Sequence, residues 1–341
     1  MEKKVRFALI GCGRISLNHL DAIKNAPHAE LVAVCDIVEE IAKKTAEENG
    51  SVNWYTDITT MLDSEKIDVC CILTPSGMHA EHACMVAEKG INVLCEKPMD
   101  VTSEKMDKII NCCKANNVKL GCIFQRRTFE AAIKTKEAIE KGWLGKVTLA
   151  DASLKYYRDQ AYYDSGEWRA TWELDGGGAL MNQGVHGVDM IAWMMGGIES
   201  VNATCETKVW DIEVEDTAVV KVRFKNGAIG VIQAATTAYP GLDTIFSVHG
   251  SEGSISFGDK GFYYWDLKDK SIKMPDIQGS MGGLNCQYST NNYGHTYQVE
   301  DMALAVLENR DPMVTGEEAK KSVEVILAIY KSSNENKEIK L

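Results

Sequence analysis

The chain has 341 residues, 45% hydrophobic and 25% charged, which is ordinary for a globular protein and long enough for two domains. Its formal net charge of -12, without any long basic run, argues against a nucleic acid as partner. No apolar segment approaches the ~20 residues that span a bilayer, so we expect no membrane partner either.

Cysteine is frequent in the first part of the chain. Nine of the 11 cysteines lie within the first 122 residues, on predicted strands and helices. None stands in a C-x-x-C pair, the spacing typical of thiol metal sites and redox sites. We therefore predict buried, reduced thiols that pack as small apolar side chains, no metal site, and a protein of the reducing cytoplasm.

The first third of the chain alternates short apolar runs with segments of helical period. Strands are predicted at 5–10, 31–35, 52–55, 69–73, 92–95 and 119–124, and helices at 15–24, 38–48, 58–62, 79–88 and 103–116. Runs that are apolar throughout indicate strands of a parallel sheet covered on both faces. We expect the α/β class, with a doubly wound Rossmann domain over residues 1–123.

A glycine-rich loop follows the first predicted strand. Its residues are Gly11, Cys12, Gly13, Arg14, Ile15 and Ser16. Between a strand and a helix, such a loop is typical of a dinucleotide site, because one glycine makes the tight turn and another lets the backbone approach a pyrophosphate. The N–H groups of the helix then face the negative charge. We predict that residues 11–15 bind the cofactor.

Asp36 ends the second predicted strand, 23 residues after Gly13. An acidic side chain at this position accepts hydrogen bonds from the adenosine ribose hydroxyls and repels a 2′-phosphate. Ile37 and Val38 follow, with no arginine beside them, so the sequence favours NAD over NADP. The alternative for Asp36 is a simple helix cap.

Thr74 and Pro75 follow the central strand, and His79 stands at the start of the next helix. The carboxyl ends of parallel strands form the ligand-binding edge of such a sheet. We therefore predict that these three residues contact the nicotinamide half of the cofactor. A residue that merely begins the helix is an equal alternative for His79.

Glu96 and Lys97 follow the buried strand at 92–95 and precede a proline. Their place at the carboxyl edge of the sheet puts a lysine beside the predicted cofactor. We predict that Lys97 is catalytic and contacts both cofactor and substrate. Glu96 is predicted to face the cofactor or to steady the lysine.

After residue 124 the pattern changes. Helices are predicted at 129–141, 297–309 and 317–332, and strands at 147–157, 219–224, 228–235, 244–250 and 254–257. Asn226-Gly227 between two apolar runs is a strong hairpin signal. We expect a second domain over residues 124–341, of α+β type with an open, mostly antiparallel sheet.

Three glycines at 176–178 precede a predicted helix at 179–195, on which Asn182 and His186 lie four residues apart on one face. Hydride removal from a secondary alcohol needs a group that takes the hydroxyl proton and a group that holds the oxygen as charge develops. We predict His186 as the base and Lys97 as the group that holds the oxygen. The reverse assignment, with Lys97 as the base and His186 holding the oxygen, stays open, because desolvation lowers the pKa of a lysine.

Other residues of the second domain are candidates for the substrate site. Arg127, Arg158 and Arg169 are suited to bind a carboxylate or phosphate in bidentate fashion, although loop arginines are also often only solvated. Tyr157 belongs to a group of aromatic residues suited to stacking on a sugar ring. His295 opens the penultimate helix and is a further substrate-binding candidate.

These motifs together resemble the Gfo/Idh/MocA family, of the glucose-fructose oxidoreductase and inositol dehydrogenase type, over essentially the whole chain. The matching segments are the glycine-rich loop 11–16, T-P-x-x-x-H at 74–79, E-K-P at 96–98 and H-x-x-D at 186–189. The resemblance implies an NAD-dependent enzyme that moves a hydride to or from a secondary hydroxyl or keto carbon of a sugar, sugar acid, nucleotide sugar or cyclitol. It also implies a homodimer or homotetramer formed through the second domain's sheet.

One position departs from the inositol dehydrogenase branch, where an aspartate usually precedes the histidine by four residues. This chain has Asn182 there, and since an amide does not accept a proton, we expect it to orient the substrate or the imidazole. The stretch 157–172 is similar to the UDP-N-acetylglucosaminuronic acid 3-dehydrogenase branch. By that resemblance Trp168 and Arg169 lie near the nicotinamide, and Gln125, Arg126 or Arg127 lines the cleft.

Two other functions on the same fold are alternatives. The first is an NAD-dependent glycosidase that acts by transient oxidation; its branch carries a Y-P-T-H-G type stretch, which does not occur at 182–186. The second is a non-catalytic regulator that senses NAD or a sugar. A sensor has no need of a proton acceptor beside the nicotinamide, so Lys97 and His186 favour an enzyme.

Overall fold

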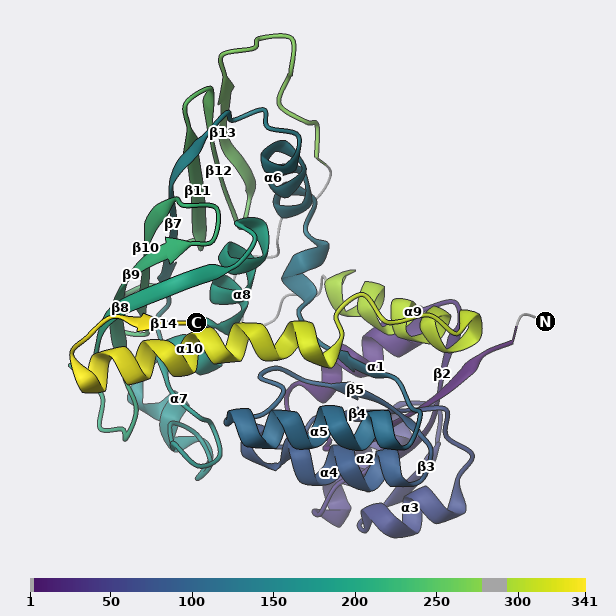
Figure 1. Cartoon of the computed structure of the whole chain (residues 1–341). Helices are drawn as coiled ribbons and strands as arrows, with labels where there is room; N and C mark the ends of the chain where they lie inside the picture. Colours follow the sequence, from purple (N-terminus) through teal and green to yellow (C-terminus); the bar gives the residue numbers. More distant parts are fainter. Residues whose placement is uncertain (1–2, 278–292) are drawn as a thin grey trace. The chain divides into compact units, whose positions relative to one another are not determined.

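A computed structural model describes residues 3–277 and 293–341, which form two compact units (Figure 1). The first unit comprises residues 1–125 and 292–320, and the second comprises 126–291 and 321–341. This division differs from the expected one, in which everything after residue 123 belonged to the second domain. The reason is helix α9, Tyr293–Glu308, whose Val299, Met302 and Ala303 are buried in the core of the first unit.

The first unit contains a six-stranded sheet whose neighbours are all parallel, in the order β3-β2-β1-β4-β5-β6. Its strands are β1 Val5–Ile10, β2 Ala29–Cys35, β3 Asn53–Tyr55, β4 Val69–Ile72, β5 Asn92–Cys95 and β6 Leu120–Cys122. The central strands are buried along almost their whole length, which explains their unbroken apolar runs. The Rossmann topology predicted from the sequence is confirmed.

Helices cover both faces of this sheet, because the strand order reverses between β1 and β4. They are α1 Ser16–Asn25, α2 Glu39–Glu48, α3 Ile58–Ser64, α4 His79–Glu88 and α5 Ser103–Ala115, with a short 3-10 turn η1 Ser76–Met78. Side chains of Asp57 and Thr102 accept hydrogen bonds from the first turns of α3 and α5. Helix α9 packs against α1, and α4 packs against α5 (Figure 1).

The second unit contains an eight-stranded sheet in the order β13-β12-β11-β7-β10-β9-β8-β14. Its strands are β7 Val147–Lys155, β8 Ile198–Glu206, β9 Thr217–Phe224, β10 Ile229–Ala235, β11 Ile245–Gly250, β12 Gly253–Gly258, β13 Gly261–Leu267 and β14 Ile339–Lys340. Only β7 and β10 pair in parallel, so the expected open, mostly antiparallel sheet is confirmed. Strands β8, β13 and β14 were not predicted.

The second sheet has one buried and one exposed face. Along β9, residues Ala218, Val220, Val222 and Phe224 are buried, and the residues between them are half-exposed or exposed. This alternation is the pattern of an antiparallel sheet that is packed on one side. The predicted hairpin between β9 and β10 is confirmed, and Gly227 takes a φ of 87° in its turn.

The helices of the second unit are α6 Glu130–Glu140, α7 Gln160–Asp164, α8 Val185–Met194 and most of α10 Gly316–Glu335, with two short turns, η2 Gln125–Thr128 and the π-helical η3 Ala179–Gln183. The continuous helix predicted at 179–195 is therefore wrong. The chain forms η3 first and begins α8 only after Gly184, whose close packing on Ala179 and Leu180 leaves no room for a Cβ.

Ten cysteines lie in the described residues, all as free thiols, and eight of them are buried. Burial raises the pKa of the Cys12 thiol to about 12 and that of Cys35 to about 11, which keeps both uncharged and unreactive at neutral pH. The prediction of buried thiols that act as small apolar side chains is confirmed for these positions. None of the helices that the structure describes is both long enough and apolar enough to cross a bilayer.

Candidate active site

The glycine-rich loop lies between β1 and α1. Gly11 has a φ of +99°, and a Cβ built on it would lie 2.8 Å from the carbonyl oxygen of Leu73, so only glycine fits there. A Cβ on Gly13 would meet no described atom within 4 Å. Ser16 closes the turn, with its hydroxyl donating to the Gly13 carbonyl at 2.7 Å. The loop thus presents open backbone at the start of a helix, as a pyrophosphate needs.

Asp36 follows β2 beside this loop. One carboxylate oxygen accepts from the Cys12 N–H and the other from the Val38 N–H, both at 2.9 Å. These two bonds fix the carboxylate next to the glycine-rich turn and leave lone pairs for further donors. Ile37 is 90% exposed. The arrangement fits the hydroxyls of an adenosine ribose and does not fit a 2′-phosphate.

His79 does not offer a free nitrogen to a cofactor. It is buried at the first residue of α4, with Nδ1 2.9 Å from the Pro98 carbonyl and Nε2 2.8 Å from the Thr74 carbonyl. The prediction of a cofactor contact is replaced by the helix-start alternative. His79 links the loop after β4 to the loop after β5, so it positions both Thr74 and the segment that carries Lys97.

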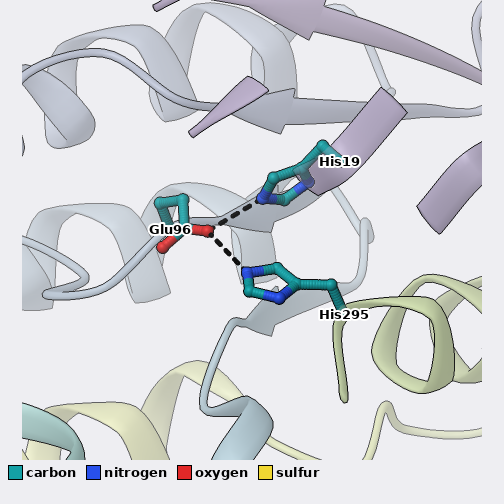
Figure 2. Close-up of side chains that lie close together, drawn as sticks. All are labelled: His19, Glu96 and His295. Atoms are coloured by element: carbon teal, nitrogen blue, oxygen red, sulfur yellow. Dashed lines mark hydrogen bonds and ion pairs between the residues drawn. The ribbon is translucent and has the colours of Figure 1, made fainter. Parts of the chain in front are cut away.

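Glu96 is a buried carboxylate at the end of β5, and its oxygens are engaged on both sides. Oε2 accepts from the N–H of Lys97 at 3.0 Å. Oε1 lies 2.8 Å from Nε2 of His19 on α1 and 3.5 Å from Nε2 of His295 on α9 (Figure 2). We call these three residues the Glu96 cluster. Its two histidines are also in edge-to-face contact, with ring centroids 5.5 Å apart.

The Glu96 cluster bears on two predicted site residues. His295, expected at the substrate, faces Glu96 inside the first unit. Glu96, expected to face the cofactor or to steady Lys97, contacts the two histidines and accepts from the Lys97 N–H. A ligand contact of either residue stays a prediction. His19 was not predicted at all, and the only signal for it was a polar residue on the apolar face of α1. Among the described residues, this is also the one group of His, Cys, Asp or Glu side chains with the spacing to hold a metal ion, all ligand atoms lying within 4.8 Å.

Asn182 and His186 lie on η3 and α8 of the second unit. Asn182 donates to Asp175 at 2.5 Å and accepts from the side-chain amide of Gln183 at 2.8 Å. His186 is buried in the first turn of α8. Lys97 belongs to the other unit, so the meeting of Lys97 with His186 stays a prediction.

Glu215 holds η3 in place and was not predicted from the sequence. Its carboxylate accepts from the N–H groups of Gly178 and Leu180 and from the hydroxyl of Tyr330, at 2.8–2.9 Å. A Cβ on Gly178 would lie 1.9 Å from the Glu215 carbonyl oxygen, so this close approach requires glycine. Burial raises the pKa of Glu215 to about 7, although these hydrogen bonds oppose the rise.

Arg127 forms a buried bidentate ion pair with Asp189 instead of facing a substrate. Its Nε and Nη2 donate to the two carboxylate oxygens at 2.9 and 2.6 Å, and Ser322 donates to the same carboxylate at 2.5 Å. A guanidinium used in this way is part of the core. The predicted substrate contact of Arg127 is therefore corrected, and Asp189 acts as its structural partner.

Arg158 and Arg169 behave differently from Arg127. Both are half-buried and lie over the ring of Tyr162, with their guanidinium carbons 5.3 and 4.6 Å from its centroid. Trp168 contacts Arg169 in the same way at 4.5 Å. In the part of the chain that the structure describes, neither guanidinium forms an ion pair with a carboxylate. Two positive groups thus flank one tyrosine without a negative partner.

The remaining predicted site residues lie in ordinary packing environments. Tyr157 is half-buried and packs edge-on against Trp210 and Tyr239, with ring centroids 6.1 and 5.1 Å away. Gln125 begins η2 and packs so closely on Gly294 that a Cβ there would lie 2.8 Å away.

Comparison with known proteins decides the family. The model for the oxidoreductase family with an NAD-binding Rossmann fold, GFO/IDH/MocA, matches residues 5–124, and the model for the GFO/IDH/MocA C-terminal domain matches residues 133–256. The WlbA dehydrogenase of Bordetella pertussis is 32% identical with a TM-score of 0.89, over 100% of this chain and 98% of the other. The chain belongs to the GFO/IDH/MocA oxidoreductase family.

Other members of the GFO/IDH/MocA family match along the whole chain as well. Myo-inositol 2-dehydrogenase of Thermotoga maritima is 29% identical over 99% of this chain and 98% of its own length. The WlbA dehydrogenase of Chromobacterium violaceum is 31% identical with a TM-score of 0.90, over 100% of this chain and 97% of the other. Both WlbA structures were solved with NADH and UDP-GlcNAcA. This GFO/IDH/MocA chain is an NAD-dependent oxidoreductase, which confirms the fold, cofactor and enzyme class expected from the sequence.

Proposed function

We propose that the protein is an NAD-dependent dehydrogenase that acts on a secondary hydroxyl or keto carbon of an acidic sugar, either a sugar acid or a nucleotide sugar. The observation that supports the acidic class is the pair Arg158 and Arg169, two guanidinium groups without a carboxylate partner in the described residues. A bound carboxylate or phosphate would supply the missing negative charge. The relatives solved with UDP-GlcNAcA carry a substrate with both kinds of group.

Three residues are proposed to carry the chemistry. A bound nicotinamide accepts or donates the hydride. His186 takes the hydroxyl proton during oxidation, and Lys97 donates a hydrogen bond to the oxygen as negative charge develops on it. Asn182, held by Asp175 and Gln183, orients the substrate or the imidazole. The exchanged assignment, with Lys97 as the base, remains part of this proposal.

The proposed binding residues are those that the sequence motifs and the family resemblance predict, less four that the structure disfavours. For the cofactor they are Gly11, Cys12, Gly13, Arg14, Ile15, Asp36, Thr74, Pro75, Lys97, Gln125, Trp168 and Arg169. For the substrate they are Lys97, Tyr157, Asn182 and His186, with Arg158 and Arg169 added. We leave out His79, Glu96, Arg127 and His295, which are buried and whose polar atoms contact groups of their own units. Arg158 and Arg169 also hydrogen-bond within their unit, but they are only half-buried and the groups they contact are neutral.

A second candidate substrate is a cyclitol, which the whole-length similarity to myo-inositol 2-dehydrogenase favours. A cyclitol has no acidic group for Arg158 and Arg169 to bind. Removing one of these arginines should therefore raise the KM for an acidic sugar and leave the KM for a cyclitol unchanged.

We further propose a homodimer or homotetramer that forms through the exposed face of the second sheet and works in the cytoplasm. Leu149, Ile229 and Val219 are 43–52% exposed on the neighbouring strands β7, β10 and β9 of that sheet. Buried free thiols suit a reducing compartment. The net charge of -12 suits neither a nucleic acid nor an anionic membrane surface as partner.

The test measures the reduction of NAD and of NADP by wild type and by Arg158→Met. The substrates compared are UDP-sugar acids, free sugar acids, neutral sugars and inositols. We expect turnover of an acidic sugar with NAD, and a KM for it that rises at least ~10-fold in Arg158→Met, as loss of a charged hydrogen bond implies. Arg310→Met, which removes a surface arginine of the first unit, is the control and should keep the wild-type KM. Turnover of inositols alone, or release of a free sugar from glycosides, would reject the acidic-sugar dehydrogenase.

A further inference from the structure

The buried carboxylate of Glu96 needs compensation, since a charge removed from water is stable only when it is paired and hydrogen-bonded. Its side chain is 5% exposed, and Figure 2 shows His19 and His295 directed at one of its oxygens. The other oxygen accepts from the N–H of Lys97. The carboxylate thus connects two buried imidazoles to the backbone of the proposed catalytic lysine.

The three residues come from separate parts of the first unit. His19 lies on α1, the helix that begins right after the glycine-rich loop, and His295 lies in the first turn of α9. Glu96 follows β5. The Glu96 cluster therefore joins the helix behind the cofactor loop to the loop that carries Lys97, and α9 covers both.

The charges of the Glu96 cluster follow from burial and hydrogen bonding. Burial alone would raise the pKa of Glu96, but the hydrogen bond from His19 and the polar contact with His295 at 3.5 Å outweigh it and hold that pKa well below its usual value. Burial lowers the pKa of His19, although Glu96 opposes this. At neutral pH Glu96 is thus a carboxylate that accepts from a neutral His19, which places the ring proton on Nε2. The other titratable groups facing Glu96, the thiols of Cys71 and Cys95, stay uncharged because burial raises their pKa.

A metal ion held by the same atoms is the competing explanation, and two observations disfavour it. Ligand atoms around tetrahedral zinc lie about 3.3 Å apart, given bond lengths of about 2.0–2.1 Å. Nε2 of His19 and Oε1 of Glu96 are 2.8 Å apart, which is a hydrogen bond. In addition, Nδ1 of His19 is buried and has no hydrogen-bond partner among the described residues, whereas a metal-bound histidine almost always donates from its second nitrogen.

We propose that His19 and His295 are positioning residues for Lys97, and that they act by holding the Glu96 carboxylate against the Lys97 N–H. The role of Lys97 rests on the function proposed above. The cluster does not touch the substrate. It keeps the lysine backbone fixed relative to the cofactor loop, so its loss lowers turnover more than it weakens NAD binding.

The experiment compares His19→Leu and His295→Leu with His19→Gln and His295→Gln. Glutamine can still donate to Glu96, and leucine cannot. We expect the leucine variants to lower kcat at least ~10-fold while the Kd for NADH changes less than ~3-fold, and His19→Gln to restore kcat to within ~3-fold of wild type. His28→Leu is the matched control, because His28 also pairs with a glutamate of α9, Glu300, away from Lys97.

The pH profile separates positioning from general loss of structure. Without the His19 donor, the pKa of Glu96 rises, so kcat of His19→Leu should gain an acid limb, a fall in kcat as pH is lowered, that wild type and His28→Leu lack. An unchanged profile, or an equal loss of kcat in His28→Leu, overturns the proposal.

Two measurements stand independently of the sugar substrate. Nitrogen-15 NMR of the histidine rings should show His19 protonated at Nε2 and bare at Nδ1; a proton at Nδ1 overturns the proposal. Elemental analysis of the purified protein should find no metal that depends on His19, and stoichiometric metal lost in His19→Leu would establish the competing metal site. If these two readouts hold while no sugar is oxidised, the proposed function fails and the Glu96 cluster stands as a structural assignment.

Discussion

Individual side chains in this protein take their roles from what surrounds them. Arg127 and Arg158 are the same residue type in the same unit, yet Arg127 is paired with Asp189 in the core and Arg158 lies over Tyr162 without a carboxylate in the described residues. Likewise, His79 and His295 are engaged inside the first unit. Residue type alone therefore did not separate ligand-binding from structural side chains.

We expect Lys97→Ala and His186→Ala each to lower kcat at least ~100-fold and to leave the Kd for NADH nearly unchanged, because both remove interactions made mainly in the transition state. Steady-state kinetics and NADH fluorescence titration measure the two quantities. His28→Ala, a histidine outside the proposed site, is the control. Full activity in either variant would refute its catalytic role.

We expect the ionisation of Glu215 to lower the free energy of unfolding as pH rises. Burial raises its pKa in the folded protein to about 7, above its value of 4.5 in the unfolded chain. The folded state therefore binds the Glu215 proton more tightly than the unfolded state does. The stability that this tighter binding contributes, up to about 3 kcal/mol, is fully present below pH 4.5 and is lost as pH rises through 7.

Glu215→Gln does not titrate, so its melting temperature should decline less than that of wild type between pH 5 and pH 8. Glu213→Gln, an exposed position two residues away, is the matched control and should follow wild type. Equal slopes in Glu215→Gln and wild type would show that Glu215 is ionised at low pH in the folded protein.

Short connecting elements, more than the helices and strands, place the predicted site residues. The loop between β1 and α1 depends on Gly11, and η3 depends on Gly178 and on the carboxylate of Glu215. Because η3 is a π-helix that ends before Gly184, Asn182 and His186 do not share one regular helical face. The predicted common helical face of Asn182 and His186 is therefore wrong, and their shared role at the site stays a prediction.

The two glycines of the cofactor loop should respond differently to alanine. Gly11→Ala requires a Cβ 2.8 Å from the Leu73 oxygen at a φ of +99°, so we expect a clear loss of stability in thermal melting. Gly13→Ala has room for its Cβ among the described residues, so it should melt like wild type and instead bind NADH at least ~10-fold more weakly. Equal melting temperatures for both variants would contradict the assigned roles.

At the scale of the whole molecule, the chain returns to its first unit after building most of its second. Helix α9 adds Val299, Met302 and Ala303 to the core of the Rossmann unit, so the two units are not consecutive in sequence. The second sheet exposes apolar side chains on one face, among them Leu149 and Ile229, which are register partners on β7 and β10. Such a face is typical of a surface that another protein covers.

We expect the double variant Leu149→Lys with Ile229→Lys to have a lower molar mass in light scattering than the wild type, which should be a dimer or tetramer. The free-energy cost of burying two lysine charges in an apolar interface exceeds the free energy that its apolar contacts contribute. Ile133→Lys, an exposed apolar position on α6, should keep the wild-type mass. A monomeric wild type would reject the proposed assembly.

The sequence by itself determined the Rossmann topology, the glycine-rich turn, the Asp36 position and the mostly antiparallel second sheet, because each depends on local periodicity or on a residue type required by one turn. Only the tertiary structure decided which polar residues meet. The contacts of Glu96 with His19 and His295, of Arg127 with Asp189, and of Glu215 with Gly178 and Tyr330 join segments 37–199 residues apart. A buried charge must find its partner in space, and spacing along the chain carries no record of that partner.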